Sequence, residues 1–407
     1  MMAEPRRIAM MMWACFPARE GGAEKQCRRQ AVELTRRGLD CRIIASRPFR
    51  DTPARESWAG GEIIRLGRWV PAMNRIMAGI RRGLAQVPSK ALLFWLELPF
   101  LWVARLSFLL DFNRWLRTEE ARGMQVFHAH ESTWMPGLAV EAAGQVGAVA
   151  LGKATSVNSL APVGYDIPFR GKWDRLRRQA AYVAPADYLR QELVQKGIPD
   201  ARAFTVPNGV ELQAETADGA NRNEVLFVGN LSQGAELKAF DILFAAWKQV
   251  QARFPAARLN LLGGGEADFW RKQVERMGCA GSVRFLGYHP DPAPFFRTAG
   301  CFVLPSRKEG MSNALLEAQA WGLPCVLSDI PANRAVAQDH ETAIFVPPGE
   351  AAALAEAISR LLADGALCRR LGAAARRNVE QRFDIRATTD RLLAVYRQLR
   401  AEGEARP

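Results

Sequence analysis

The chain has 407 residues, of which 49% are hydrophobic and 24% are charged, and its formal net charge is +13. This length is too great for one compact core, so we expect two domains of ordinary globular composition. Seven cysteines form no CxxC pair and only four histidines occur, which disfavours both a disulfide framework and a multi-histidine metal site.

The first elements alternate between strand and helix. Residues 6–16 are predicted to form a strand, because their short apolar run fits a first strand better than a signal peptide. A loop with Gly21 and Gly22 follows, and then a helix that ends at Gly38. Residues 41–46 are predicted to form the second strand.

A basic segment is followed directly by an apolar one. Residues 65–90 contain no acid but six cations: Arg65, Arg68, Arg75, Arg81, Arg82 and Lys90. In the apolar segment 91–112, Glu97, Pro99 and Arg105 argue against a membrane-spanning helix. We therefore expect this region to lie on an anionic membrane, the alternative being a core helix after a solvated basic loop. No recognised nucleic-acid motif accompanies the charge, so a nucleic-acid partner is not predicted.

The same alternation continues to the end of the chain. Strands are predicted within residues 124–130, 146–154, 181–184 and 202–212. The polar stretch 213–223 is interpreted as a linker. After it, strands are predicted within residues 224–230, 257–266, 282–288, 300–306, 324–329 and 343–349, and two helices finish the chain.

This alternation implies an α/β fold with two Rossmann-like domains that face a cleft. The expected domains cover residues 1–212 and 222–380, and residues 381–407 are expected to form a helix that packs near the domain junction. Ligands of such sheets bind outside the carboxyl ends of the strands.

One such strand end carries two acids, Glu309 and Glu317. The expected order is strand, polar turn and helix, and Ser312 or Asn313 can cap the helix. A helix start presents free N–H groups and suits a phosphate, while carboxylates can accept hydrogen bonds from sugar hydroxyl groups. The turn and helix start contain Gly310, Met311, Ser312 and Asn313.

The run over residues 305–330 resembles the Glu-x7-Glu signature of family-4 (group 1) retaining glycosyltransferases, which have the GT-B architecture. The resemblance implies that Glu309 contacts the transferred sugar and that Glu317 holds the nucleotide ribose. It also implies that residues 1–212 bind the acceptor and that residues 222–380 bind the nucleotide sugar. Without the surrounding match, two surface acids on an amphipathic helix would be the plainer interpretation.

Two motifs of the first half resemble the same family. The Gly21–Gly22 loop resembles its GG-x-E loop, which approaches the donor phosphates and the acceptor. His128 and His130 resemble its H-x-H-[DE] segment, and strand alternation puts both on one face. The resemblance assigns the donor sugar to His130, with His128 as a structural partner behind it. A plain turn and a hydrogen-bonded histidine pair without substrate contact are the alternatives.

A third motif, VLFVGNLSQGAELKAFDIL, resembles the donor-phosphate segment of the family. Lys238 matches the lysine that neutralises the diphosphate. Asn230 stands where an arginine is usual, and Ala239 where a glycine is usual. The amide removes a full charge beside the leaving group, for which Arg307 or Lys308 is a candidate substitute.

Glycine turns complete the resemblance. The run 263–265 ends a strand as the family's G-x-G does, and the backbone at Gly287 and Tyr288 is expected to frame the nucleobase. Asn208 and Gly209 resemble the hinge-side turn of the family but are interpreted as a plain β-turn.

The resemblance implies a metal-independent, retaining glycosyltransferase of the hexosyltransferase type, with a nucleoside-diphosphate sugar as co-substrate and no other cofactor. A glycan or lipid-linked acceptor at the cytoplasmic face of a membrane, of the lipopolysaccharide kind, fits the basic and apolar first half. A degenerate protein that binds the nucleotide sugar without turnover is the alternative. A nicotinamide-dependent oxidoreductase is disfavoured, because the first loop lacks G-x-G-x-x-G.

Overall fold

The chain folds into two compact units in a computed structural model that describes residues 5–14, 21–84, 90–217, 221–232 and 236–404. Unit 1 contains residues 1–207 and 388–407, and unit 2 contains residues 208–387. These limits differ from the expected ones because the chain passes between the units twice. The second passage lies within helix α15 (Ile385–Glu404), whose residues from Thr388 onward belong to unit 1.

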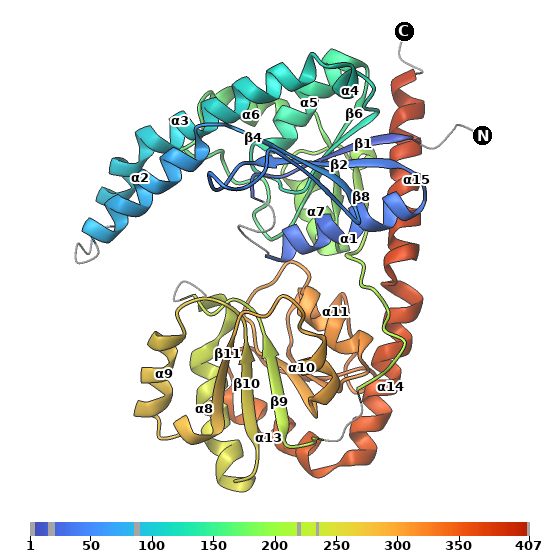
Figure 1. The fold of residues 1–407 in the computed structure, drawn as a ribbon. Helices are drawn as coiled ribbons and strands as arrows, with labels where there is room; N and C mark the ends of the chain where they lie inside the picture. The colour runs from blue at the N-terminus through green and yellow to red at the C-terminus, as the bar shows by residue number, and fades with distance from the viewer. Residues whose placement is uncertain (1–4, 15–20, 85–89, 218–220, 233–235, 405–407) are drawn as a thin grey trace. The chain divides into compact units, whose positions relative to one another are not determined.

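Unit 1 is built on an eight-stranded sheet in the order β3-β4-β2-β1-β5-β6-β7-β8 (Figure 1). All neighbouring strands run parallel except β3 and β4, which form an antiparallel hairpin at the edge. The strands are β1 (Arg7–Met11), β2 (Asp40–Ser46), β3 (Arg55–Trp58), β4 (Gly61–Leu66), β5 (Val126–Ala129), β6 (Val149–Lys153), β7 (Ala181–Ala184) and β8 (Ala203–Thr205).

Helices cover both faces of this sheet. Along β1, Ile8 and Met10 join a core that includes Leu392 and Tyr396 of α15, while Ala9 and Met11 join a second core on the other face. Strands buried on both faces explain the continuous apolar runs in the sequence. The helices are α1 (Gly22–Arg36), α2 (Val70–Gly83), α3 (Lys90–Leu116), α4 (Glu119–Arg122), α5 (Met135–Val146), α6 (Arg170–Arg177), α7 (Asp187–Gln195) and the short η1 (Asp200–Arg202).

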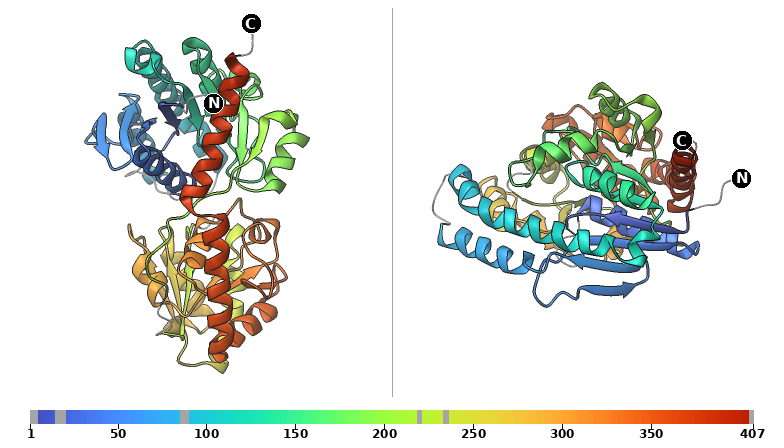
Figure 2. Two further views of the ribbon diagram at one scale, coloured as in Figure 1. Left: turned by 90° about the vertical axis from the view of Figure 1, so that its right-hand side faces the viewer. Right: turned by 90° about the horizontal axis from the view of Figure 1, so that it is seen from above.

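The described part of the basic segment is mostly the helix α2 rather than a loop, and this helix lies beside α3 (Figures 1 and 2). Arg65 was expected to be one of the surface cations, but it is buried. It is 3% exposed and pairs with Glu56 of the β3–β4 hairpin at 2.6 Å. Arg81 pairs with the buried Glu97 of α3 at 2.6 Å. The side chain of Lys90 lies outside the described residues.

Unit 2 holds a six-stranded, fully parallel sheet in the order β11-β10-β9-β12-β13-β14. Its strands are β9 (Glu224–Val228), β10 (Arg258–Leu262), β11 (Val283–Gly287), β12 (Cys301–Leu304), β13 (Cys325–Ser328) and β14 (Ile344–Val346). Its helices are η2 (Glu236–Lys238), α8 (Phe240–Arg253), α9 (Ala267–Arg276), η3 (Ala280–Ser282), α10 (Ala293–Thr298), α11 (Asn313–Ala320), α12 (Pro331–Arg334), α13 (Ala351–Ala363) and α14 (Gly365–Arg382). Residues 218–220 of the expected linker lie outside the described residues.

Both sheets contain a point where the strand order reverses. In unit 1 the chain moves from β1 outward to β2 on one side and later to β5 on the other. In unit 2 it moves from β9 outward to β10 and later to β12. Open α/β sheets bind ligands outside the carboxyl ends of the strands at such a switch point. The expected α/β class with two Rossmann-like domains is confirmed.

Candidate functional site

The switch point of unit 2 brings together the residues with the strongest sequence signal. Asn230 follows β9, Lys238 ends η2, and Glu309 follows β12. The Lys238 Nζ atom lies 2.5 Å from Glu309 Oε1, and the Ser306 hydroxyl donates to the same oxygen at 2.8 Å. The Glu309 side chain is 12% exposed and that of Lys238 is 23% exposed. The site therefore holds a matched ion pair that remains partly open to solvent.

Helix α11 begins beside this ion pair. Ser312 is its N-cap, and the Ser312 hydroxyl accepts a hydrogen bond from the Leu315 N–H at 3.2 Å. The Glu317 side chain lies in the second turn, where the residue is only 6% exposed. Gly310 and Met311 lie in the turn before the N-cap, and Asn313 is the first residue of the helix. These residues and Glu309 therefore come together at one strand end, which leaves their assignment to phosphate, sugar and ribose as a prediction.

Asn208 contacts the start of α11, although it lies about a hundred positions earlier in the chain. Its side-chain amide donates to Asn313 Oδ1 at 3.1 Å and to the Met311 carbonyl at 3.5 Å. It is buried at 7% exposure. The sequence interpretation treated it as part of a plain turn, so this link was missed. The residue type was the available signal, because a buried asparagine requires hydrogen-bond partners.

The two departures from the family pattern have clear local roles. Asn230 accepts a hydrogen bond from the Ser232 N–H at 2.9 Å, which closes an Asx turn. Ala239 is the N-cap of α8 and has φ 54° and ψ 45°, the left-handed region in which glycine is favoured. The usual glycine at this position therefore has a backbone reason, and alanine holds the Lys238 turn under strain.

The candidate substitutes for the absent arginine differ in their availability. The Arg307 guanidinium forms two hydrogen bonds with the Asp241 carboxylate, at 2.9 and 2.6 Å, which keep the pKa of Asp241 below its usual value. Arg307 is therefore engaged at the start of α8. Lys308 is exposed, so among these two it is the cation with the greater freedom to reach a ligand.

The glycine run after β10 allows close approach between strand ends. A Cβ atom on Gly263 would lie 1.8 Å from the Gly229 carbonyl oxygen, and one on Gly265 would lie 2.6 Å from the backbone of Leu231. The Gly263 N–H donates to the Gly287 carbonyl at 2.8 Å. These contacts fix the ends of β9, β10 and β11 relative to one another. At the end of β11, Tyr288 is 54% exposed, so the surface expected to frame a base is open.

The switch point of unit 1 contains the two histidines, both deeply buried. The His128 Nδ1 atom lies 2.7 Å from the Tyr396 hydroxyl, and the two imidazole centroids are 4.3 Å apart. His130 is 1% exposed, and among the described residues neither of its ring nitrogens has a hydrogen-bond partner. Burial holds the pKa of both imidazoles well below the usual value. His128 thus has a structural contact, whereas His130 has unmet hydrogen-bonding capacity.

Lys153 is a neighbour of His130 that the sequence interpretation missed. It ends β6, one position beyond the paired residues Ala129 and Gly152, and is 3% exposed. Its ammonium has no hydrogen-bond partner among the described residues, and burial lowers its pKa to about 8. The available signal was a lysine at the end of an otherwise apolar run.

The glycine pair of unit 1 begins α1. Gly21 is the N-cap, and its N–H donates to the Glu24 carboxylate at 3.1 Å, while Gly22 is the first helical residue. Gly21 has φ −91°, so its backbone does not require glycine. The preceding residues 15–20 of the expected loop lie outside the described residues.

The described cysteines and acids offer no evident metal centre. Six cysteines are free thiols, and five of them are buried. In the described ranges, no three His, Cys, Asp or Glu side chains are grouped so that they could hold a metal ion.

Comparison with known proteins gives both halves of the chain a match. Residues 20–214 match the model described as "Glycosyltransferase Family 4", and residues 222–364 match the model described as "Glycosyl transferases group 1". Together these ranges cover most of the chain, and each lies largely within one structural unit.

Curated relatives show the same pattern. The chain is 33% identical over 167 residues to the lipopolysaccharide core biosynthesis glycosyltransferase LpsE of Rhizobium meliloti. The aligned region covers 41% of this chain and 48% of that protein. It is also 33% identical over 214 residues to the phosphatidyl-myo-inositol mannosyltransferase of Mycobacterium tuberculosis. This aligned region covers 49% of this chain and 55% of that protein. The chain therefore spans about half the length of these curated relatives.

A solved structure matches over nearly the whole chain. Anabaena Alr3699/HepE, determined in complex with UDP-glucose, aligns with a TM-score of 0.68 and 16% identity, covering 96% of this chain and 98% of that one. At this identity the likeness establishes the fold, which is the GT-B arrangement of two parallel-sheet domains.

Proposed function

The chain belongs to the glycosyltransferases of family 4 and group 1, and on this premise we propose that it transfers a hexosyl group from a nucleoside-diphosphate sugar to a glycan or lipid-linked acceptor. The curated relatives act on a lipopolysaccharide core and on phosphatidyl-myo-inositol by name, which supports an acceptor in glycan or lipid-linked biosynthesis. The complex of HepE with UDP-glucose supports a nucleotide-sugar donor.

The observation that carries the proposal is the Lys238–Glu309–Ser306 cluster beside the start of α11. Lys238 and the helix start provide the positive charge that a diphosphate requires, and Glu309 provides an acceptor for sugar hydroxyl groups. Because the Lys238 ammonium and the Glu309 carboxylate lie side by side, we expect the donor to place its phosphate oxygens on Lys238 and its hydroxyl groups on Glu309. Glu317, one helical turn further, would hold the ribose.

We propose that transfer retains the anomeric configuration and needs no metal ion. The acceptor hydroxyl would attack the anomeric carbon on the face from which the diphosphate departs, and its proton would pass to a diphosphate oxygen. The charge that develops on the diphosphate would be stabilised by Lys238 and by N–H groups of the turn before α11. In such a scheme Glu309 orients the sugar and forms no covalent bond. His130 of unit 1 remains a predicted contact of the reacting sugar, and its burial means that it must become accessible.

A transfer assay tests the proposal. Purified protein is incubated with a panel of nucleoside-diphosphate hexoses and candidate acceptors, with and without EDTA, and the product anomer is read by proton NMR. We expect a product with the anomeric configuration of the donor and an unchanged rate in EDTA. An inverted anomer contradicts the retaining mechanism, and loss of activity in EDTA contradicts the metal independence.

The second candidate is a protein that binds the donor without turnover. It is favoured by Asn230, whose amide closes a turn where a cation would face the leaving group. The two candidates differ in one assay: an enzyme hydrolyses or transfers the sugar slowly even without its best acceptor, whereas a binding protein leaves the donor intact. Lys308→Gln sharpens the comparison, since the enzyme is expected to slow if Lys308 replaces the absent charge.

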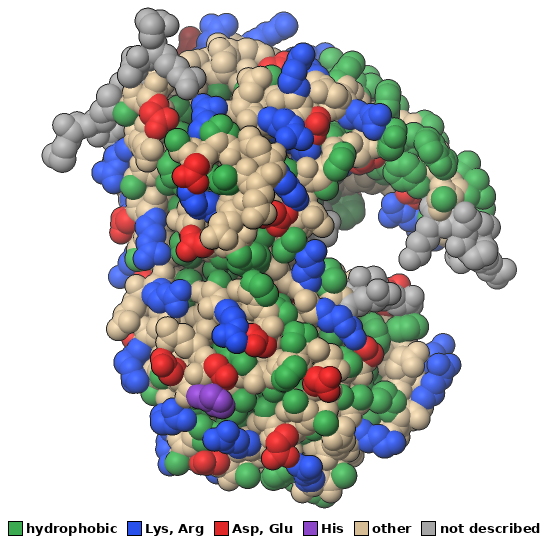
Figure 3. Space-filling model, turned by 180° about the vertical axis from the view of Figure 1, so that it is seen from behind, with side chains coloured by type: hydrophobic (Ala, Val, Ile, Leu, Met, Phe, Trp, Pro, Cys, Tyr) green, Lys and Arg blue, Asp and Glu red, His purple; other side chains and the backbone are tan. Residues whose placement is uncertain are grey.

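We also propose that unit 1 lies on the cytoplasmic face of a membrane through α3. Its exposed apolar residues follow helical spacing and form one stripe, which we call the α3 stripe: Leu92, Trp95, Leu96, Pro99, Trp102 and Val103. Figure 3 shows hydrophobic side chains gathered over the projecting pair α2 and α3. Large exposed apolar surfaces of this kind are typical of membrane or partner contacts.

A location on the membrane fits α3 better than a path through it. Ala91–Leu116 is long and apolar enough to cross a membrane by length and composition, with a mean hydropathy of 1.6 and 28% of its most apolar window buried. However, Phe108, Phe112 and Trp115 pack in the core of unit 1, and Glu97 is buried against Arg81. The helix is therefore part core and part exposed, which supports contact by its exposed half.

Sedimentation with vesicles tests this contact. We expect Trp95→Glu to reduce binding to phosphatidylglycerol vesicles strongly, and Arg75→Gln with Arg82→Gln to reduce it in a salt-dependent way. Arg253→Gln of unit 2, another exposed arginine, is the matched control. Unchanged vesicle binding by Trp95→Glu contradicts the assignment of α3 to the membrane.

A further inference from the structure

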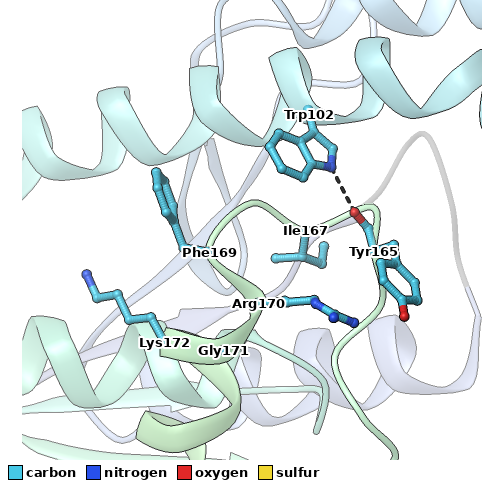
Figure 4. A pocket seen from close by; sticks show the side chains of 7 residues that line it. All are labelled: Trp102, Tyr165, Ile167, Phe169, Arg170, Gly171 and Lys172. Carbon is cyan, nitrogen blue, oxygen red and sulfur yellow. Dashed lines mark hydrogen bonds between the residues drawn. The ribbon is translucent and has the colours of Figure 1, made fainter.

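Unit 1 contains a pocket of about 410 Å³ beside α3 (Figure 4). Its residues come from α3, from the segment that leads into α6 and from the first turn of α6. Trp102 reaches it from the helix, and Phe169 points toward that helix from the opposite side (Figure 4). The lining residues are Trp102, Tyr165, Ile167, Phe169, Arg170, Gly171 and Lys172. No residue of this group belongs to either switch point described above.

The pocket is held in shape by contacts between α3 and the segment before α6. The Trp102 indole N–H donates to the Tyr165 carbonyl at 2.8 Å, and the Arg105 guanidinium lies 3.4 Å from Asp166 Oδ2. The wall residue Ile167 is buried at 4% exposure. The apolar surface of Trp102, Ile167 and Phe169 is thus presented on a fixed frame.

Two cations stand at the same pocket. The Arg170 guanidinium stacks over the Tyr165 ring at 4.0 Å and forms no ion pair with any carboxylate of the described residues. The Lys172 ammonium lies 2.6 Å from Glu141, and its side chain is 42% exposed. Arginine favours phosphate because its planar fork can donate two hydrogen bonds. Positive charge therefore borders an apolar cavity, with Arg170 available for an anion.

Phe169 is the residue whose placement lacks a folding explanation. It has φ 60° and ψ 30°, a left-handed conformation that an aromatic residue rarely adopts, and it is 63% exposed. A large apolar ring that is neither buried nor in a relaxed backbone conformation gains little from the fold. Strain of this kind is typical of functional sites, where the ring contacts a ligand.

The α3 stripe continues into this pocket, because Trp102 belongs to both. We propose that the pocket binds one anionic amphiphile, with its hydrocarbon chain against Trp102, Ile167 and Phe169 and its phosphate on Arg170 beside Lys172. The proposal rests on the proposed function and makes it specific: the acceptor is a lipid phosphate taken as a single molecule. Arg170 provides the charge complementarity, and the α3 stripe provides an apolar path to the pocket.

Calorimetric titration of the full chain with decyl phosphate, below its micelle concentration, tests the proposal. Decanol, inorganic phosphate and a methyl glycoside are titrated in parallel. We expect decyl phosphate to bind at least about tenfold more tightly than decanol, and inorganic phosphate and the glycoside to bind weakly. Equal affinity for decanol contradicts the role of Arg170, and preferential binding of the glycoside contradicts a hydrocarbon ligand.

Variants separate the pocket from its surroundings. Arg170→Gln and Phe169→Ala are each expected to weaken decyl phosphate binding about tenfold. Arg175→Gln on α6 and Phe49→Ala, at an exposed aromatic residue outside both the pocket and the α3 stripe, are the matched controls and should bind as the wild type does. Equal weakening by the controls overturns the assignment.

Phe169→Gly guards against an indirect folding effect. Glycine accepts the left-handed backbone, so we expect an unchanged or higher Tm together with weaker decyl phosphate binding. A Phe169→Gly protein that binds decyl phosphate as tightly as the wild type contradicts the contact between the ring and the ligand.

Two further measurements complete the test. The first distinguishes a single lipid molecule from a bilayer as the source of the phosphate, and the second distinguishes failure of the pocket proposal from failure of the proposed function. If the pocket serves a single acceptor molecule, Arg170→Gln loses decyl phosphate binding but still sediments with phosphatidylglycerol vesicles. A parallel loss of both indicates a bilayer contact and overturns the proposal. Stabilisation by nucleotide sugars reports on the donor site and not on this pocket, so its absence contradicts the proposed function while decyl phosphate binding still supports the pocket.

Discussion

The two switch points carry polar groups in opposite states. In unit 2, Lys238 and Glu309 form a pair that is partly open to solvent and is joined by Ser306. In unit 1, His130 and Lys153 are buried, and their side chains have no hydrogen-bond partner among the described residues. A partly exposed ion pair lowers the stability of the fold only slightly, whereas unpaired buried polar groups lower the stability of the unit that contains them. Catalysis and stability are therefore expected to respond differently to mutation at the two points.

The largest effect is expected from breaking the pair in unit 2. Glu309→Gln removes the charge that positions Lys238 and weakens the contacts to the sugar, so transfer should fall about 100- to 1,000-fold with little change in Tm. The measurement is kcat in the transfer assay. Glu356→Gln, an exposed acid of the same unit that pairs with Arg253, is the control and should leave the rate unchanged. A Glu309→Gln enzyme of normal rate contradicts the site.

The second effect is a gain in stability from unit 1. The pKa of Lys153 in the folded protein is about 8, against 10.5 for an ordinary lysine. Above about pH 10.5 the Lys153 amine is neutral in both the folded and the unfolded chain, and the protein has its full stability. As the pH falls from 10.5 to 8 this stability is progressively lost, and below pH 8 it remains lost. A pKa difference of this size corresponds to about 3 kcal/mol.

Lys153→Met is accordingly expected to raise the free energy of unfolding by about 3 kcal/mol at pH 7, with the gain shrinking between pH 8 and 10.5. Urea unfolding at several pH values measures it. Lys248→Met, at an exposed position of α8, is the control and should show no such pH dependence. If the gain in unfolding free energy does not depend on pH, the stabilisation comes from packing, and the role given to the buried charge is contradicted.

A third change tests the side-chain hydrogen bond between Tyr396 and His128. Tyr396→Phe leaves the buried Nδ1 atom of His128 without its partner at 2.7 Å, so we expect a loss of about 2 kcal/mol in unfolding free energy. Tyr165→Phe, at an exposed tyrosine of the same unit, should have no comparable effect. An equal Tm for wild type and Tyr396→Phe contradicts the structural role given to His128.

Acid unfolding of the wild type examines the same histidines. Their pKa values in the fold are well below 6.5, so both imidazoles are neutral in the folded chain and take up protons on unfolding below that pH. The stability that they contribute is complete above pH 6.5 and falls as the pH drops below it. Replacing both by glutamine should flatten the decline measured by urea unfolding between pH 6.5 and 5, and an unchanged slope contradicts their burial as neutral groups.

The smallest effect concerns the strained turn after Lys238. Ala239→Gly places glycine at φ 54° and should raise the stability of unit 2 by about 1 kcal/mol. The transfer rate should be preserved or raised, because Lys238 lies directly before this residue. Ala246→Gly, inside α8, should instead destabilise the unit. A loss of stability in Ala239→Gly contradicts the strain.

The sequence predicted the parallel architecture because strands buried on both faces appear as apolar runs bounded by glycine and proline. It missed the β3–β4 hairpin, in which β3 is a short, polar edge strand and β4 carries the buried Ile63 and Ile64 beside it. Arg65 looked like one cation of a basic surface, but its partner Glu56 lies across that hairpin, and such a pairing is not visible in a local pattern.

The candidate site was predicted more completely in unit 2 than in unit 1. The spacing of Glu309 and Glu317 and the cap at Ser312 follow from local sequence, whereas the contact of Lys238 with Glu309 joins residues 71 positions apart. Lys153 escaped notice because burial and the lack of a partner are properties of the packed molecule. The left-handed backbone of Ala239 likewise required coordinates, although the departure from glycine was evident beforehand.

The most direct test of the central claim is a thermal-shift panel of nucleoside-diphosphate sugars on the wild type, Glu317→Ala and Glu317→Gln. A ligand that binds only the folded state raises the Tm by linkage. The account predicts that at least one donor raises the Tm of the wild type and that both variants, each measured against its own unliganded Tm, lose most of that shift. Equal shifts in all three proteins would contradict a nucleotide-sugar site at the switch point of unit 2.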